Sequence, residues 1–294
     1  MCMVCCGELL HNPQRFISEL QDKKQIPTYM KMANVSGGYR LNHGVWDCVR
    51  SLFKMHNETF NIYTALLPFV FFVYITVAIA QRDVLSMMEK IVTSVYTLTA
   101  CFSFAASTLF HLFGSISKRA HIKLLQLDMI GIALLIGGSY FPCTYFAFEN
   151  SPATYITYLS IVTILTLTCC FIFVVPKYAM GYTGFRITVF ASVAGFGLVV
   201  IGHIIYENGF SNAKLTSQVI RVFYTYGMYA LGIVFYASKV PESLVGPKWK
   251  FTQYFHSHNI WHIFVFLGTL VHYLSIEHML NFVADVATAP VRLD

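Results

Sequence analysis

Two histidines, His258 and His262, stand four residues apart at the head of the last long apolar run in the sequence. Side chains at positions i and i+4 share one face of an α-helix, so this spacing turns both imidazoles in the same direction. Neutral imidazole is a favoured ligand of zinc. The pair is therefore a candidate for part of a metal site, with a polar network that ties helices together as the alternative.

The composition indicates the environment in which such a site would lie. The chain has 294 residues, of which 56% are hydrophobic and 12% are charged. Soluble domains carry about 25% charged residues, so this composition is typical of an integral membrane protein. The eight cysteines form no opposed CxxC pairs, which argues against a zinc ribbon and against a disulfide framework.

Seven apolar runs follow a polar N-terminal region, and each is about long enough to cross a bilayer as a helix. Helices satisfy their own backbone hydrogen bonds in lipid, and the runs are too long for strands. The sequence therefore predicts an all-α membrane protein, with a seven-transmembrane helix bundle over residues 57–283. We expect a cytosolic segment at 1–56, with an interfacial helix near 15–24, and a short tail at 284–294. The predicted spans are 62–80, 91–114, 124–148, 156–175, 187–206, 222–238 and 258–276.

The basic residues predict how the bundle is oriented in its membrane. Fifteen of the 20 Lys and Arg residues fall in the N-terminal region or in loops on the same side of the membrane. Cytosolic loops of membrane proteins carry an excess of Lys and Arg. We therefore expect a cytosolic N-terminus and an extracellular or lumenal C-terminus.

Other polar residues fall at the same depth as the histidine pair. His111 lies near the cytosolic end of the second predicted span, Ser107 one helical turn before it, and Asp128 early in the third span. Ionisable groups inside a span are costly and are candidates for function. Three histidines and a water form an open zinc site, and a nearby aspartate can accept a proton from that water. We therefore expect Zn²⁺ ligation by His111, His258 and His262, with Asp128 and Ser107 as catalytic residues.

Glu58 and Asn61 lie at the head of the first predicted span, and two roles suit them. An acidic residue in the first turn of a helix complements the helix dipole, and Asn57 and Thr59 are good helix-start residues. Alternatively, Glu58 and Asn61 bridge the first span to the metal-binding helices through hydrogen bonds to the ligands.

Four motifs spread over the chain resemble the signature motifs of the progestin and adipoQ receptor (PAQR) family. The resemblance covers about residues 27–280, including Gly38-Tyr39-Arg40 and the stretch from Ser238 to Glu242. The motifs are Asn57-Glu-Thr-Phe-Asn61-Ile-Tyr-Thr, Ser107-x3-His111, Leu127-Asp128 and Ser257-His258-x3-His262.

The resemblance implies a seven-helix receptor with an intramembrane zinc site near the cytosolic face. It also implies that the protein hydrolyses a lipid amide such as ceramide to a sphingoid base and a fatty acid. The alternative is a non-enzymatic receptor for a steroid or protein hormone, or a membrane-homeostasis protein, in which zinc is structural. The expected partners are the bilayer and a lipid or hormone ligand, with a homo-oligomer as the alternative to a monomer and no nucleic acid. The plasma membrane, the Golgi and the endoplasmic reticulum all suit these spans.

The predicted topology can be tested with the two glycosylation sequons at Asn34 and Asn57. Both lie on the predicted cytosolic side, where the glycosylation machinery does not reach them. Glycosidase treatment of protein from eukaryotic membranes should leave its electrophoretic mobility unchanged. A mobility shift abolished by Asn57→Gln would contradict this topology.

Overall fold

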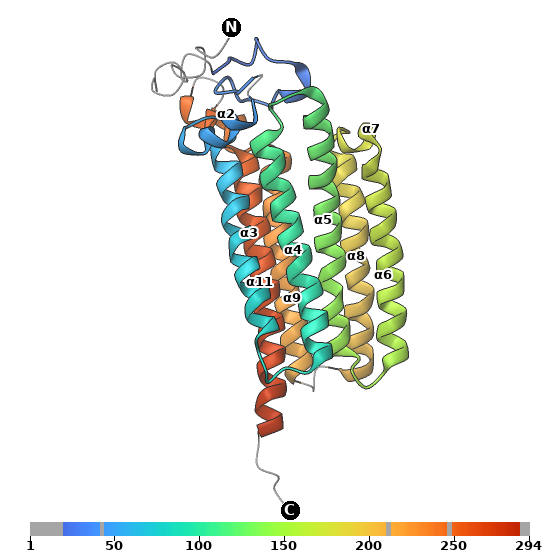
Figure 1. Ribbon diagram of the computed structural model, residues 1–294. Coiled ribbons are helices and arrows are strands. Elements are labelled where there is room, and N and C mark those ends of the chain that lie inside the picture. The colour runs from blue at the N-terminus through green and yellow to red at the C-terminus, as the bar shows by residue number, and fades with distance from the viewer. Residues whose placement is uncertain (1–19, 42–43, 210–212, 246–248, 289–294) are drawn as a thin grey trace, which may run out of the picture.

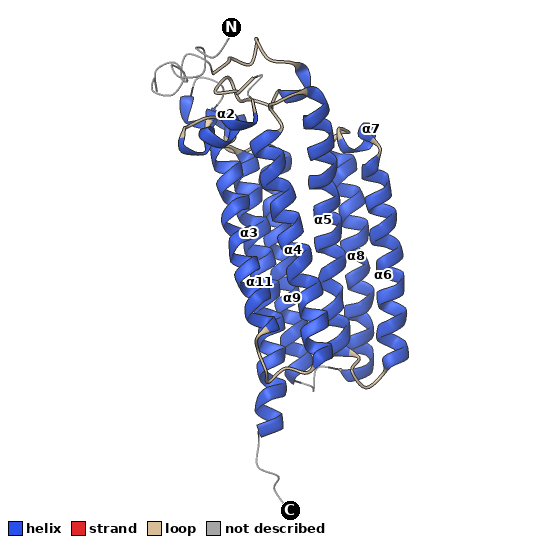
Figure 2. Cartoon of the chain, viewed as in Figure 1, coloured by secondary structure: helices blue, strands red, loops and turns tan. Residues whose placement is uncertain are grey.

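The computed structural model describes residues 20–41, 44–209, 213–245 and 249–288. This described part contains seven helices that are long and apolar enough to cross a membrane, and it has no strand (Figure 2). The predicted all-α seven-helix membrane fold is therefore confirmed. The long helices are α3 (Thr59–Ala80), α4 (Met87–Phe113), α5 (Lys118–Ala147), α6 (Pro152–Val174), α8 (Thr183–Asn208), α9 (Ala213–Ser238) and α11 (Ser257–Thr288).

Short helices lie in the connections at one end of the bundle. The short helix α2 lies where α3 begins, and α7 lies where α6 ends (Figure 1). Both are at the end from which the chain enters the bundle. We call this the histidine end, because α4 ends there with His111 and α11 begins there with His258. The short elements are α2 (Val45–Arg50), α7 (Pro176–Ala179), α10 (Glu242–Val245) and the 3₁₀ turns Thr28–Met30, Ser51–Phe53 and Lys250–Gln253.

Local sequence signals explain where several of the long helices start. Ser86 and Glu89 form a capping box at the start of α4, in which each side chain accepts a hydrogen bond from the other residue's backbone N–H. The Ser117 hydroxyl accepts from the Ala120 N–H at the start of α5. Pro152 occupies the first turn of α6, where no backbone donor is required.

The segment before the bundle folds back over the histidine end without forming a long helix. Gln21 and Tyr39 exchange two backbone hydrogen bonds of 2.8 and 3.2 Å, and Ile26 and Val35 pack with Tyr39 in a small buried cluster. The interfacial helix expected near 15–24 lies largely outside the described residues. Its described part, residues 20–24, is not helical, because Gln21 pairs with Tyr39.

The bundle exposes apolar side chains outward and buries polar ones at the histidine end. Leu67, Ile164 and Phe171 are largely exposed on the outer surfaces of α3 and α6, as expected of side chains that face lipid. The middle of the bundle is an apolar core in which the rings of Phe72 and Phe104 stack with centroids 5.9 Å apart. Positions facing lipid and positions facing the core are thus both apolar, which explains the continuous apolar runs of the sequence.

Two glycines let α5 approach both of its neighbours. A Cβ atom at Gly138 would overlap Thr99 Oγ1 of α4, and one at Gly137 would overlap Thr166 Oγ1 of α6. Small residues allow helices in a membrane to pack closely. This packing holds α5, and therefore Asp128, against α4.

We expect Gly138→Ala to lower stability, because α4 and α5 must separate to admit the methyl group. Overpacking of this kind costs about 1–3 kcal/mol. The matched control is Gly227→Ala on α9, where an added Cβ meets no atom within 4 Å. Thermal unfolding of both variants in the same detergent gives the comparison. Equal melting temperatures for Gly138→Ala and Gly227→Ala would refute the close approach.

Candidate metal centre

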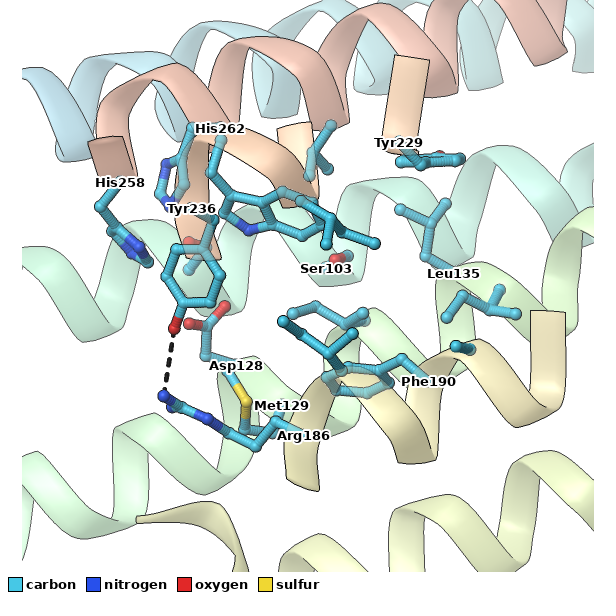
Figure 3. A pocket seen from close by; sticks show the side chains of 18 of the residues that line it. Ser103, Asp128, Met129, Leu135, Arg186, Phe190, Tyr229, Tyr236, His258 and His262 are labelled. Carbon is cyan, nitrogen blue, oxygen red and sulfur yellow. Dashed lines mark hydrogen bonds between the residues drawn. The ribbon is translucent and has the colours of Figure 1, made fainter. Parts of the chain in front are cut away.

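Three imidazoles converge at the histidine end from two helices. His111 lies in the last turn of α4, and His258 and His262 lie in the first two turns of α11. Each offers a ring nitrogen, and these three atoms lie within 4.8 Å of one another, so the group can hold a metal ion. His111 and His262 are buried, with 4% and 7% of their surfaces exposed. Figure 3 shows His258 and His262 turned toward the same interior space.

The hydrogen bonds of the rings leave the lone pairs that a metal requires. His111 Nδ1 lies 2.8 Å from Glu58 Oε2, and since a carboxylate accepts, Nδ1 carries the proton. The Thr64 hydroxyl donates to the Phe60 carbonyl, so its oxygen accepts from His262 Nδ1 at 3.2 Å. Nε2 of both rings is therefore unprotonated, and His111 Nε2 is buried without a protein partner. Metal-binding histidines have this arrangement, so the residues fit a metal ion.

A chain of hydrogen bonds fixes the position of Glu58. Its Oε2 accepts from Asn61 Nδ2 at 2.6 Å, and Asn61 Oδ1 accepts from Asn259 Nδ2 at 2.6 Å. Asn259 Oδ1 in turn accepts from the backbone N–H of His256 at 2.6 Å. Glu58 occupies the N-cap position of α3, but its side chain makes no capping hydrogen bond. Glu58 contacts both His111 and Asn61. These contacts match the second of the two expected roles, in which Glu58 and Asn61 connect the first span to the helices that carry the histidines.

The same contacts determine the ionisation of the Glu58 carboxyl. Burial raises the pKa of the Glu58 carboxyl, but the adjacent His111 and the hydrogen bonds from His111 and Asn61 outweigh burial, so this pKa lies below its usual range. Burial lowers the pKa of His256, which keeps that imidazole neutral. The carboxylate is therefore held ionised, as an acceptor for His111 Nδ1–H.

Two buried charged residues, for which the sequence predicted no role, form hydrogen bonds at the ends of the helices that carry the histidines. Arg40 donates to the carbonyl oxygen of His111 and to Ser51 Oγ, each at 2.6 Å. The Glu242 carboxylate accepts from the backbone N–H of Ser257 at 2.7 Å and from its hydroxyl. Arg40 thus satisfies a free carbonyl at the end of α4, and Glu242 caps the start of α11. Both residues lie in stretches of the sequence that resemble family motifs, and this resemblance is the signal that could have identified them.

The chain matches the model of the haemolysin-III-related family over residues 53–273. It belongs to this family. It is 34% identical to heptahelical transmembrane protein 1 of Arabidopsis thaliana over 87% of this chain and 79% of that protein. It is 31% identical to the adiponectin receptor protein of Drosophila melanogaster, over 79% of this chain and 52% of that protein. It is 28% identical to progestin and adipoQ receptor family member 3 of Mus musculus, over 82% of this chain and 79% of that protein.

The matched region contains all three histidines of the cluster. The relatives carry names from the progestin and adipoQ receptor family, so the membership expected from the four motifs is confirmed. Those motifs lie far apart in the sequence of this haemolysin-III-related protein, and the fold brings their polar side chains together at the histidine end.

Asp128 and Ser107 lie beside the histidines without belonging to the ligand cluster. Both are buried, and the Ser107 hydroxyl lies within hydrogen-bonding reach of the Asp128 carboxylate. Figure 3 shows Asp128 facing the space below His258 and His262. The described part of the chain therefore has a carboxylate near the cluster, in a position to bind a group that the histidines also contact.

Arg186 and Tyr236 complete the wall of this space and were not predicted from the sequence. Arg186 Nη2 donates to the Tyr236 hydroxyl at 3.1 Å, and Figure 3 marks this bond. Arg186 Nε is buried and has no protein partner. Arg186 lies just outside the predicted span 187–206, among the fifteen basic residues on the predicted cytosolic side. The structure includes it in α8.

The histidine cluster lies at one end of a cavity of about 1470 Å³. The cavity continues between the helices past Leu135 and Phe190, which Figure 3 shows farther along α5 and α8. Leu198 of α8 and Phe223 of α9 line the cavity, and they are 54% and 49% exposed. The cavity therefore opens between α8 and α9 toward the lipid-facing side of the bundle.

Histidines at the opposite end take other roles. His272 is buried and its Nε2 lies 3.1 Å from the Ser139 carbonyl oxygen, as expected for a hydrogen-bonded core histidine. His203 contacts the Tyr158 hydroxyl at 2.9 Å and Glu207 at 3.0 Å. Its side chain is 30% exposed, because it lies near the end of α8.

We expect Glu58→Gln to weaken zinc binding about 10–100-fold, because an amide loses the charge that orients His111. Glu277→Gln is the control, since Glu277 pairs with Arg82 at the opposite end of the bundle. Zinc content after dialysis against graded chelator gives the affinities. Equal zinc retention by the two variants would contradict the role of Glu58.

Proposed function

We propose that this chain is a receptor-type membrane protein with an intramembrane zinc site that hydrolyses a lipid amide, ceramide being the model substrate. One observation carries the proposal. Ring nitrogens of three histidines converge at the polar end of an otherwise largely apolar cavity that opens toward lipid. Three imidazoles with room for a fourth ligand suit catalytic zinc, and no cysteine lies in the cluster.

Zinc held by His111, His258 and His262 would polarise the amide carbonyl and lower the pKa of a water molecule. The Asp128 carboxylate accepts a proton from that water as the water oxygen bonds to the carbonyl carbon. The carbon–nitrogen bond then breaks, and the proton on Asp128 passes to the leaving nitrogen. Ser107 keeps the carboxylate in position by donating to it. The products are a sphingoid base and a fatty acid.

Arg186 is placed to act on the acyl half of the substrate. Its Nη2 donates to Tyr236, and its Nε is buried without a protein partner. A guanidinium group binds carboxylates through two adjacent N–H groups. We therefore assign Arg186 and Tyr236 to the carboxylate of the fatty acid product.

The route of the substrate follows from the cavity. We place the histidine end at the cytosolic face, in keeping with the distribution of basic residues. A lipid then enters between α8 and α9, where Leu198 and Phe223 are both exposed and part of the wall. Its amide reaches the histidines, and its acyl chain extends along the apolar part of the cavity.

A second function is favoured by the origin of the ligands. Because His111 is on α4 while His258 and His262 are on α11, a bound zinc ion would join the two helices. In this alternative, zinc is structural and the protein is a non-enzymatic receptor for a steroid or protein hormone, or a membrane-homeostasis protein. Zinc removal would then lower the melting temperature, and no lipid would be turned over.

Zinc-loaded protein incubated with a panel of ceramides should release fatty acid. Asp128→Asn should slow release about 10²–10⁴-fold with zinc content unchanged, because the amide cannot accept the proton. His111→Ala should lose both zinc and turnover. The control is Gln126→Met, a buried substitution on the same helix outside the cavity wall. Full activity in Asp128→Asn would rule out Asp128 as the proton acceptor, and no release by the wild-type protein would favour the structural alternative.

A further inference from the structure

A second group of polar side chains lines the cavity at the end opposite the histidine cluster. Ser139 and Cys143 contribute from α5, Gln218 from α9 and His272 from α11, and all four line the cavity. We call this group the distal cluster. The charged residues among the described cavity-lining side chains lie at the histidine end, so the distal cluster is neutral.

Gln218 offers an acceptor that no protein group uses. Its Nε2 donates to the Cys143 carbonyl at 3.3 Å, and because a carbonyl cannot donate, this contact fixes which way the amide is turned. Its Oε1 is buried and has no protein partner, and the residue as a whole is only 3% exposed. A buried acceptor without a partner is unfavourable by about 1–3 kcal/mol, so this atom favours a ligand that brings a donor.

His272 sets the remaining chemistry of the distal cluster. Its Nε2 lies 3.1 Å from the Ser139 carbonyl oxygen and 3.6 Å from Cys143 Sγ. Since the carbonyl accepts, Nε2 carries the proton and the imidazole donates to the backbone. With no cation in the cluster, a carboxylate is disfavoured there, and a neutral hydroxyl suits it.

The two ends of the cavity are separated by the length of a long lipid chain. His258 and His272 lie on α11, and at 1.5 Å rise per residue they are about 21 Å apart along its axis. Asp128 and Cys143 give about 22 Å along α5 by the same rise. The wall between the ends is mainly apolar and includes Leu135 and Phe190 (Figure 3). A straight chain with a polar group at each end therefore fits better than a compact ring system.

We propose that the distal cluster is a subsite for a hydroxyl group at the far end of an acyl chain, so that the cavity selects ω-hydroxylated acyl lipids. The hydroxyl donates its proton to Gln218 Oε1. This proposal rests on the proposed function to the extent that the carboxyl or amide end of the lipid lies at the histidines.

The test compares the binding of ω-hydroxypalmitic acid and palmitic acid to zinc-loaded protein in detergent. The wild-type protein should bind the hydroxylated acid about fivefold more tightly, as expected for one net hydrogen bond. Gln218→Met keeps the side-chain volume and removes the acceptor, so this ratio should fall to about one. Gln126→Met is the matched control, because Gln126 is also buried with an unpartnered Oε1 but does not line the cavity. Its ratio should equal that of the wild-type protein.

Each outcome separates this proposal from the proposed hydrolase. Equal affinities for the two acids in the wild-type protein, or a preference that persists in Gln218→Met, would overturn the distal subsite and leave the hydrolase intact. A normal preference in a protein that releases no fatty acid from ceramide would overturn the hydrolase and support the subsite. Failure of both acids to bind would overturn the distal subsite, and release of fatty acid from ceramide would still decide the hydrolase.

Discussion

The hydrogen bond between Glu58 and His111 is the contact on which the histidine end depends. It joins the start of α3 to the end of α4, and through Asn61 and Asn259 it continues to the start of α11. His111, Asn61 and Asn259 are buried and Glu58 is partly buried, so an unpaired carboxylate there would be unfavourable. Three helices must therefore meet in one register for the carboxylate to be satisfied, and that register also brings the three imidazoles together.

Polar groups gather at the histidine end because the backbone there requires partners as well. The last carbonyls of α4 and the first N–H groups of α11 have no partners within their own helices. Arg40 and Glu242 supply them, and each is almost fully buried. The groups that position the ligands and the groups that end the helices thus form one network, so damage to either should disturb both stability and metal binding.

The cavity results from uneven packing around the bundle. On one side, α5 is drawn against α4 and α6 by glycines that admit no side chain. On the other side, Leu198 of α8 and Phe223 of α9 line the cavity and are 54% and 49% exposed. The closely packed helices carry Asp128 and His111, whereas the loosely packed pair forms the wall that a lipid would pass.

The sequence by itself determined the number of spanning helices, their approximate bounds and the family, because long apolar runs and spaced motifs depend only on local residue type. It also indicated His111, His258 and His262, since positions within one span determine depth. It did not reveal Arg40, Arg186, Tyr236 or Gln218, whose partners are distant in the chain and whose types are common in loops and helix ends. Only the tertiary structure decided which ring nitrogens stay free and where the cavity runs. Both depend on how each helix is rotated about its axis. The sequence does not encode this rotation, because the residues that face lipid and those that face the core are both apolar.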